Sequence, residues 1–459
     1  MAGIVAIYNL LAETDSNIIT QYLSHSMQML QHRGKAYWKM VIGDRMIGKE
    51  GSLPPDNDIL KMAQGQKLCA NNGIGYLSKR SPQFPSMNTI HAALDGFFVD
   101  TEKLHLHPYI GQARHLDSLF KCYYIFVYLL FKRENPELAA EFLDRHLRGN
   151  LIIKVNDDIY AYRNSSGFKP LVVGTNRDKT LYIIASENSL RTSFIDMDFK
   201  DIAAGQLTKL SLKKGLESLT NLAGGRLMMD PFEFIRESHV AAVINGKSVY
   251  AIRKNIGREQ ANLLANEIDT SSAYAEPDYT RPMALGFSIE YQRHRKDFEI
   301  SEGIIKDRYD DSDHMIDFSE QVSKNKLLTT GRSLKFVIKN LVQNKKVATI
   351  QGTIQTGSTA RETIYYLRNA GAQCIDVIVS YVPTIDGRQV GLYTHNRELL
   401  ANKYVGEVSS INELNNKITK EIGADSLNYN SPEILARGIG LSEKNLWFPE
   451  WVRFLDYRK

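Results

Sequence analysis

A short loop in the last third of the sequence has the residue types to hold a phosphate group. The loop, Thr356-Gly357-Ser358-Thr359, follows a β-branched run at residues 347–350 that predicts a strand. After the loop, Ile364 and Leu367 predict an amphipathic helix that ends at Gly371. A helix N-terminus offers N–H groups and the positive end of its dipole to an anion, so the loop predicts a phosphate site. Glycine and hydroxyl residues can also serve only to turn the chain and cap the helix, and the loop alone does not separate these alternatives.

The elements around this loop predict a parallel sheet. Residues 375–382 form another β-branched run, so strand, helix and strand make a βαβ unit with a right-handed crossover. Further helices are predicted at residues 248–267 and from Met283 onward.

The first half of the sequence shows a different order of elements. Strands are predicted at residues 3–8, 150–162, 170–174, 181–185 and 206–212, and helices at residues 17–31, 117–131 and 137–147. This order predicts an α+β layered domain, with sheets that carry helices on their outer faces. Residues 215–225 are small, polar and glycine-containing, and they mark the predicted domain boundary.

The composition excludes several classes of protein. With 43% hydrophobic and 24% charged residues among 459, the chain is typical of a globular protein of two or three domains. The net charge of +5 is mild, and no basic block alternates with aromatic residues as a nucleic-acid groove would require. Neither a signal peptide nor a membrane-spanning stretch is predicted, so we expect a cytoplasmic protein.

No metal site is predicted. The three cysteines lie far apart without a CxxC pair, which argues against zinc, an iron–sulfur cluster or a disulfide framework. Residues 307–317 hold five aspartates and His314, but a solvated acidic loop is favoured there because nothing fixes a coordination geometry.

Several motifs occur in an order that resembles the amidophosphoribosyltransferase family over nearly the full length. In the first half these are Gly3-Ile4-Val5, residues 30–34 (LQHRG), residues 163–171 and Ala185-Ser186-Glu187. In the second half they are residues 245–250, Pro277-Asp278, residues 284–286, residues 306–309, the loop from Thr353 to Arg361 and residues 422–427.

The resemblance implies a fold and a division into domains. Residues 1–220 would be an Ntn-hydrolase-like αββα domain of the class II glutamine amidotransferase type. Residues 221–459 would be an α/β type I phosphoribosyltransferase domain with a central parallel sheet. Family members form homo-oligomers, so we expect an oligomer here, either with copies of itself or with an active relative. His32 in the LQHRG motif is interpreted as a packing and helix-dipole partner.

The positions that the resemblance assigns to glutaminase chemistry hold unsuitable residues. The family nucleophile is a cysteine exposed by removal of the initiating methionine, and this chain has Ala2 there. The substrate-holding arginine falls on Ser78, and the asparagine of the oxyanion hole falls on Asp95. We therefore expect no glutaminase activity.

The phosphoribosyl positions are only partly retained. The two carboxylates that hold the ribose of phosphoribosyl pyrophosphate (PRPP) fall on Gln351 and Gly352. A phosphate cradle is expected at Thr353, Thr356, Gly357, Ser358 and Thr359. Lys306, Arg308, Tyr309 and Asp278 are further candidates for contact with PRPP or a nucleotide.

The sequence thus predicts an amidophosphoribosyltransferase-like protein of purine nucleotide biosynthesis without its own catalysis. It would act as a partner or regulatory subunit. Two alternatives stay open: an ammonia-dependent or residual phosphoribosyltransferase, and a sensor of a purine nucleotide or phosphate. No cofactor is expected, apart from Mg²⁺ with PRPP if residual activity remains.

Overall fold

The computed structural model describes residues 2–11, 17–66, 68, 70–79, 86–87, 89–222, 224–306, 335–391 and 398–457. The chain forms two compact units. The first comprises Met1–Asp230 together with Glu237–Ser248, and the second comprises Pro231–Arg236 together with Val249–Lys459.

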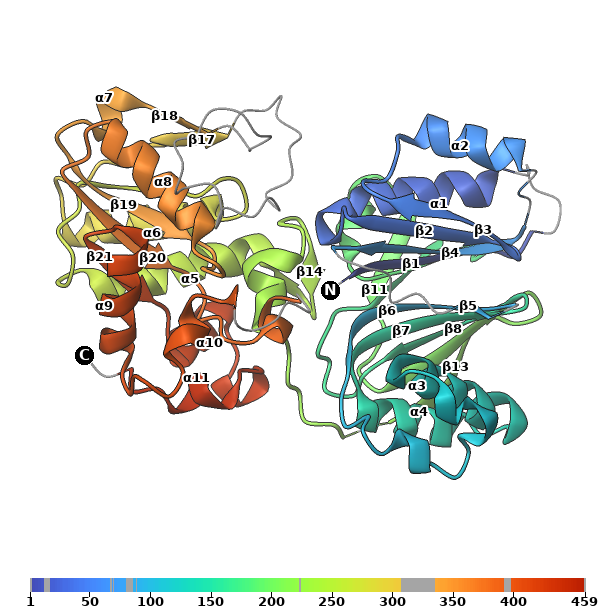
Figure 1. Ribbon diagram of the computed structural model, residues 1–459. Helices are drawn as coiled ribbons and strands as arrows, with labels where there is room; N and C mark the ends of the chain where they lie inside the picture. Colours follow the sequence, from blue (N-terminus) through green and yellow to red (C-terminus); the bar gives the residue numbers. More distant parts are fainter. Residues whose placement is uncertain are drawn as a thin grey trace. The chain divides into compact units, whose positions relative to one another are not determined.

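Two antiparallel sheets make up most of the first unit (Figure 1). The seven-stranded sheet has the order β11-β9-β10-β1-β4-β2-β3, and the six-stranded sheet has the order β13-β12-β8-β7-β6-β5. The strands of the first sheet are β1 (Ala2–Asn9), β2 (Tyr37–Ile42), β3 (Arg45–Glu50), β4 (Asn72–Ser78), β9 (Val172–Asn176), β10 (Leu181–Ala185) and β11 (Met197–Asp201). Those of the second are β5 (Ser86–Met87), β6 (Ile90–Phe98), β7 (Leu147–Val155), β8 (Asp158–Arg163), β12 (Gln206–Ser211) and β13 (Gly215–Asn221).

Three apolar layers hold the first unit together. One, which includes Leu23 and Trp38, lies between the seven-stranded sheet and the helices α1 (Ile18–Met29) and α2 (Asp56–Gly65). A second, with Ile4 and Ile152, lies between the two sheets. The third, with Phe126, lies between the six-stranded sheet and the helices α3 (Ser118–Val127) and α4 (Pro136–His146). The unit is therefore an αββα sandwich, as the sequence predicts.

A four-stranded parallel sheet forms the core of the second unit. Its order is β16-β19-β20-β21, and all three strand pairs are parallel. The strands are β16 (Ser272–Ala275), β19 (Lys346–Gln351), β20 (Cys374–Val379) and β21 (Ser426–Tyr429). The helices are α5 (Val249–Leu264), α6 (Arg281–His294), α7 (Lys339–Val342), α8 (Ser358–Asn369), α9 (Ile411–Ile422), α10 (Pro432–Ile439) and α11 (Glu450–Phe454). A separate antiparallel pair joins β17 (Ile304–Lys306) to β18 (Lys335–Val337).

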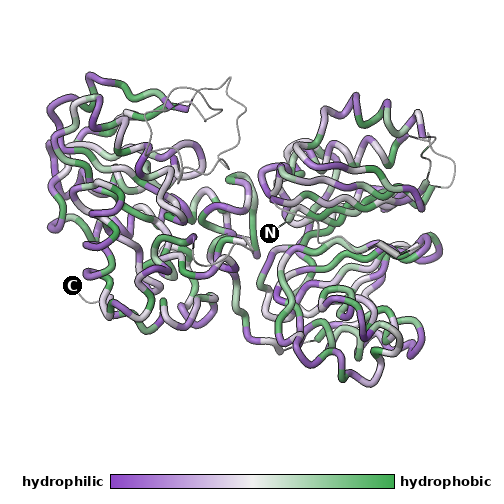
Figure 2. The backbone as a smooth tube through the Cα atoms, in the orientation of Figure 1, coloured by the Kyte–Doolittle hydropathy of each residue, from purple (hydrophilic) through white to green (hydrophobic). Residues whose placement is uncertain are grey.

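The predicted strand–helix–strand unit is confirmed as β19, α8 and β20. Ile350 of β19 lies opposite Ile378 of β20 in a parallel register, and Ile364 and Leu367 are buried on α8. Hydrophobic residues follow the strands of the sheets, as Figure 2 shows. Within the described residues, every helix is too short or too polar to span a lipid bilayer.

The described structure also locates the junction of the units. The predicted boundary at residue 220 falls within β13, which pairs with β12 in the first unit. Beyond it, β14 (Val243–Ile244) and β15 (Lys247–Ser248) form a two-stranded hairpin that belongs to the first unit.

Candidate functional site

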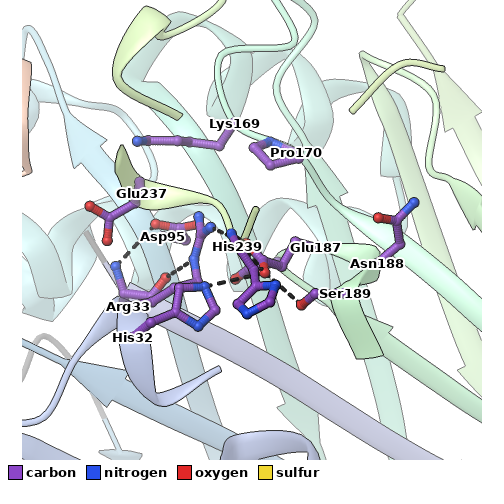
Figure 3. A network of polar contacts seen from close by, with 12 residues as sticks. His32, Arg33, Asp95, Lys169, Pro170, Glu187, Asn188, Ser189, Glu237 and His239 are labelled. Atoms are coloured by element: carbon purple, nitrogen blue, oxygen red, sulfur yellow. Dashed lines mark hydrogen bonds and ion pairs between the residues drawn. The ribbon is translucent and has the colours of Figure 1, made fainter. Parts of the chain in front are cut away.

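A buried arginine lies at the centre of a polar network in the first unit (Figure 3). Arg33 ends the short 3-10 turn η1 (Gln31–Arg33) that follows α1, and its side chain is fully buried. The next residue is Gly34, where a Cβ would lie 2.5 Å from the Ser78 nitrogen and 2.6 Å from the Ser78 Cα. Glycine thus allows the chain to pass close against β4, which brings Arg33 beside β1.

Three hydrogen bonds fix the Arg33 guanidinium. Its Nε donates to the Ala2 carbonyl oxygen at 3.2 Å, Nη1 to Glu187 Oε2 at 2.9 Å and Nη2 to Asp95 Oδ2 at 3.0 Å. The side chains of Asp95 and Glu187 are 0% and 1% exposed. Because an isolated buried charge is costly, each of these carboxylates depends on the guanidinium.

Glu187 is the most heavily bonded carboxylate of the network. It lies 3.2 Å from His32 Nε2, accepts from Ser189 Oγ at 2.6 Å and accepts from the backbone N–H of His239 at 3.1 Å. Burial alone would raise the pKa of Glu187, but His32, Arg33 and Ser189 outweigh it and hold that pKa well below its ordinary value. Glu187 is therefore an anion at neutral pH.

The structure brings together the three positions that the resemblance assigns to glutaminase chemistry. Ala2 of β1 lies opposite Ser78 of β4 in the strand register, and Asp95 Oδ1 accepts the Ala2 backbone N–H at 3.1 Å. Ala2 is buried, and its methyl group offers no nucleophile. Both oxygens of Asp95 are bonded, one to Ala2 and the other to Arg33, so this side chain acts as an acceptor.

Arg33 and Glu187 are not among the site residues that the sequence predicts. The sequence predicts His32 as a packing and dipole partner, and its Nδ1 does contact the Met29 carbonyl oxygen at 3.1 Å. Its other ring nitrogen forms the contact with Glu187, which the helix position alone did not indicate. The sequence does hold one indication of both residues. Arg33 and Glu187 lie in the motifs at residues 30–34 and 185–187, just after a predicted helix and a predicted strand.

Two ion pairs attach Asp230 and Glu237 to the rest of the first unit. Lys169 Nζ lies 2.6 Å from Asp230 Oδ2, and Lys79 Nζ lies 2.8 Å from Glu237 Oε2. Both of these carboxylates are 0% exposed. The Glu237–Ser248 segment is thus an integral part of the first unit, beside Glu187.

In the second unit, the predicted phosphate loop connects β19 to α8. Gly357 has a φ of 80°, in the left-handed region that favours glycine, and is the N-cap of α8. The Thr356 hydroxyl accepts from the Ser358 backbone N–H at 3.4 Å and lies 3.1 Å from Ser358 Oγ. The first-turn N–H groups of a helix have no partner inside that helix, so this geometry can serve an anion. Of the predicted cradle, Thr356 is exposed, Thr353, Ser358 and Thr359 are partly buried, and Gly357 is buried.

Gln351, which ends β19, and Gly352, which follows it, carry no charge. Gln351 is 2% exposed, and its Nε2 lies 3.2 Å from Thr349 Oγ1 and 3.4 Å from Glu276 Oε2. The amide NH2 of Gln351 is therefore already hydrogen-bonded inside the protein. Gly352 has no side chain, so this strand end offers no carboxylate to the Mg²⁺ that accompanies PRPP.

Glu276 belongs to a buried ion-pair cluster that the sequence did not reveal. Its Oε1 lies 2.6 Å from Lys335 Nζ, and its Oε2 accepts from Thr363 Oγ1 at 2.7 Å. Lys335 also lies 3.5 Å from Glu362 Oε2. Burial alone would lower the pKa of Lys335, but Glu276 and Glu362 reverse that effect and raise it. The cluster ties β18 to the sheet and to α8.

The other predicted contact residues are placed only in part. Lys306 ends β17 and lies opposite Lys335 in the register of β18, while Asp278 is exposed. Arg308 and Tyr309 lie outside the described residues. In the ranges that the structure covers, no three His, Cys, Asp or Glu side chains are grouped to hold a metal ion.

The fold and these positions define a class: an Ntn-type glutamine amidotransferase-like unit followed by a type I phosphoribosyltransferase-like unit. No family profile matches the chain. It is 28% identical over 426 residues to the amidophosphoribosyltransferase of Synechococcus elongatus, which covers 87% of this chain and 81% of that relative. It is 25% identical over 459 residues to that of Archaeoglobus fulgidus, covering 96% and 94%.

A solved structure of an amidotransferase shares the fold of this chain. The Bacillus subtilis glutamine PRPP amidotransferase, complexed with ADP and GMP, superimposes with a TM-score of 0.71 at 21% identity and covers 95% of this chain and 92% of that one. The resemblance inferred from the motifs is thereby confirmed, and the chain is a relative of the amidophosphoribosyltransferases.

Proposed function

We propose that the chain is an amidophosphoribosyltransferase-like protein of purine nucleotide biosynthesis that catalyses neither glutamine hydrolysis nor phosphoribosyl transfer. It acts as a partner or regulatory subunit, in a homo-oligomer or together with an active relative. The observation that carries the proposal is the buried Asp95 carboxylate, held by Arg33 and the Ala2 N–H where the family places an oxyanion donor.

The chemistry of the first unit supports the loss of glutaminase activity. Attack on a carboxamide needs a nucleophile and hydrogen-bond donors for the negative charge that develops on oxygen. Ala2 supplies no nucleophile, and Asp95 would repel that oxygen. Loss of one oxyanion donor typically costs about 3–4 kcal/mol of transition-state stabilisation, and the nucleophile is lost in addition.

The strand end in the second unit supports the loss of transferase activity. A phosphoribosyl transition state develops positive charge on the sugar, which carboxylates beside the ribose would stabilise. Gln351 is bonded to Thr349 and Glu276, and Gly352 has no side chain. The Glu276 carboxylate, which contacts Gln351, is paired with Lys335 Nζ at 2.6 Å.

An assay of the purified chain tests this proposal. PRPP consumption is measured with glutamine and, separately, with ammonium, and glutamate release is measured in parallel. We expect all three signals to stay at the level of the buffer, with an active amidophosphoribosyltransferase as the positive control. Turnover with ammonium alone would favour a residual transferase, and glutamate release would refute the proposal for the first unit.

The partner role has its own test. Affinity purification from native cells is expected to recover either copies of the chain or an active relative. A chain that elutes at the size of a single copy, with no relative attached, would contradict the partner role.

A second candidate function is a sensor that binds a phosphate compound without reaction. The left-handed Gly357 at the N-cap of α8, with the Thr356 and Ser358 hydroxyls beside it, favours this candidate. In a thermal-shift titration, inorganic phosphate, AMP, GMP or PRPP is expected to raise the melting temperature of the natural chain. The Gly357→Arg variant is expected to show no such rise. Stabilisation that persists in Gly357→Arg would remove the loop as the site.

A further inference from the structure

An aromatic ring covers the strand end that would face a ribose. A Cβ built on Gly352 would lie 2.5 Å from Tyr279 Oη and 2.7 Å from Tyr279 Cζ. Real Cβ atoms do not approach other heavy atoms this closely, so the Tyr279 ring occupies the space in which any side chain at position 352 would begin. Gly352 and Tyr279 are therefore a matched pair, in which the missing side chain makes room for the ring.

The backbone explains why Tyr279 reaches this position. The chain leaves β16 beside β19, because the Glu276 backbone N–H donates to the Ile350 carbonyl oxygen at 3.0 Å. Tyr279 follows three residues later and thus lies over the residue that continues β19.

Two arginines of the same unit contact Tyr279, one at its ring and one at its backbone. The Arg236 guanidinium carbon lies 5.1 Å from the centre of the Tyr279 ring, within cation–π distance. Arg253 Nη1 donates to the Tyr279 carbonyl oxygen at 3.5 Å. The ring is partly buried, so its position is supported by more than one contact.

Gln351 does not compensate for the covered position. Its amide is bonded to Thr349 and Glu276 beneath the strand end, as described above. The NH2 group of Gln351 is thus already used, and Gly352 has no side chain, so neither residue supplies a further side-chain donor to a sugar hydroxyl. A hydroxyl that loses water there without gaining a hydrogen bond disfavours binding.

The geometry points to Tyr279 as the residue that decides ligand class at this site: the phosphate loop takes inorganic phosphate or a small phosphate monoester, and Tyr279 excludes a ribose from the strand end. This inference rests on the proposed phosphate-binding function of the loop and narrows its ligand. A ribose phosphate bound there gains nothing from its sugar.

Calorimetric titration tests the inference with inorganic phosphate and ribose 5-phosphate as the two probes. The natural chain should bind inorganic phosphate and ribose 5-phosphate with affinities that differ by less than about threefold. The same ratio is expected for Tyr279→Phe, which keeps the ring. Tyr279→Ser is expected to bind ribose 5-phosphate about tenfold more tightly than the natural chain does, with inorganic phosphate unchanged. A natural chain that prefers ribose 5-phosphate by about tenfold, or a Tyr279→Ser variant with an unchanged ratio, would overturn the inference.

A second measurement checks the ring position without any ligand. Gly352→Ala is expected to lower the melting temperature strongly in the natural chain and much less in Tyr279→Ser, because only the natural chain has the ring against the new Cβ. Equal effects in the two backgrounds would overturn the matched pair. Absence of phosphate binding in every variant would overturn the proposed loop function and the ligand inference together, whereas phosphate binding without the Tyr279→Ser gain overturns the inference alone.

Discussion

Replacement of Arg33 by methionine should be among the most destabilising single changes in the first unit. Methionine fills a similar volume but removes the hydrogen bonds that the guanidinium donates to Ala2, Asp95 and Glu187. The two carboxylates of Asp95 and Glu187 would stay buried without their cation.

The magnitude follows from the burial of these groups. Breaking a buried ion pair by removing one partner costs about 3–5 kcal/mol. In a unit of this size each kcal/mol lowers the melting temperature by about 2–4 °C, so the expected loss is about 6–20 °C. Arg145→Met is the matched control, because the Arg145 side chain is 75% exposed and pairs with Glu141 at 3.4 Å on the surface. The control should change stability by less than about 1 kcal/mol.

The pH dependence gives a sharper test. In the natural chain the pKa of Glu187 is depressed, so its stabilisation is present above the ordinary pKa and is lost as the pH falls toward the folded-state pKa. In Arg33→Met the burial of Glu187 favours its protonated form, so the variant should gain stability relative to the natural chain as the pH falls from about 7 to about 5.

Hydrogen exchange of peptides from β1 and β6, read by mass spectrometry, isolates the first unit from the second. Equal opening of these strands in Arg33→Met and Arg145→Met would contradict the stabilising role of the Arg33 guanidinium. A loss of stability in Arg33→Met, relative to the natural chain, that is the same at pH about 7 and at pH about 5 would also contradict that role.

Three further variants test other parts of the molecule. Lys335→Met should destabilise the second unit by about 3–5 kcal/mol, because the buried Glu276 and Glu362 lose their cation. Thermal unfolding should show a loss of less than about 1 kcal/mol for the control Lys345→Met, whose side chain is 32% exposed. Gly357→Ala and Gly406→Ala both place a Cβ at positive φ, at 80° and 84°, and each should cost about 1–2 kcal/mol. Only Gly357→Ala should also reduce stabilisation by inorganic phosphate, and equal phosphate responses in a thermal-shift assay would contradict this. Ala2→Cys should release no ammonia from glutamine, since the oxyanion position still holds a carboxylate, and measurable release would show that position 2 alone limits the activity.

The parts of the fold that depend on neighbouring residues were predictable from the sequence. The β19, α8 and β20 unit follows from a β-branched run, a helical spacing and a second β-branched run in direct succession. The left-handed conformation of Gly357 follows the same logic, because glycine tolerates it at a helix start.

The polar network was not predictable in this way, because its members are far apart in the chain. Arg33 is 62 residues from Asp95 and 154 residues from Glu187. Their contact depends on the packing of two sheets and on the close passage at Gly34, which periodicity does not record. Likewise, the sequence shows a missing side chain at Gly352 but not the ring that covers it, because the Tyr279 ring comes from the turn that follows the neighbouring strand β16.

The path of the chain between its two units limits how either one can be exchanged as a module. The chain leaves the first unit after Asp230, contributes Pro231–Arg236 to the second and returns as Glu237–Ser248. A truncation at residue 220 would leave Lys169 without Asp230 and Glu187 without the His239 N–H. A chimera therefore preserves the first unit only if its junction lies after residue 248. That junction separates Pro231–Arg236 from the rest of the second unit. The two halves can diverge in sequence, but they cannot be replaced as separate continuous blocks.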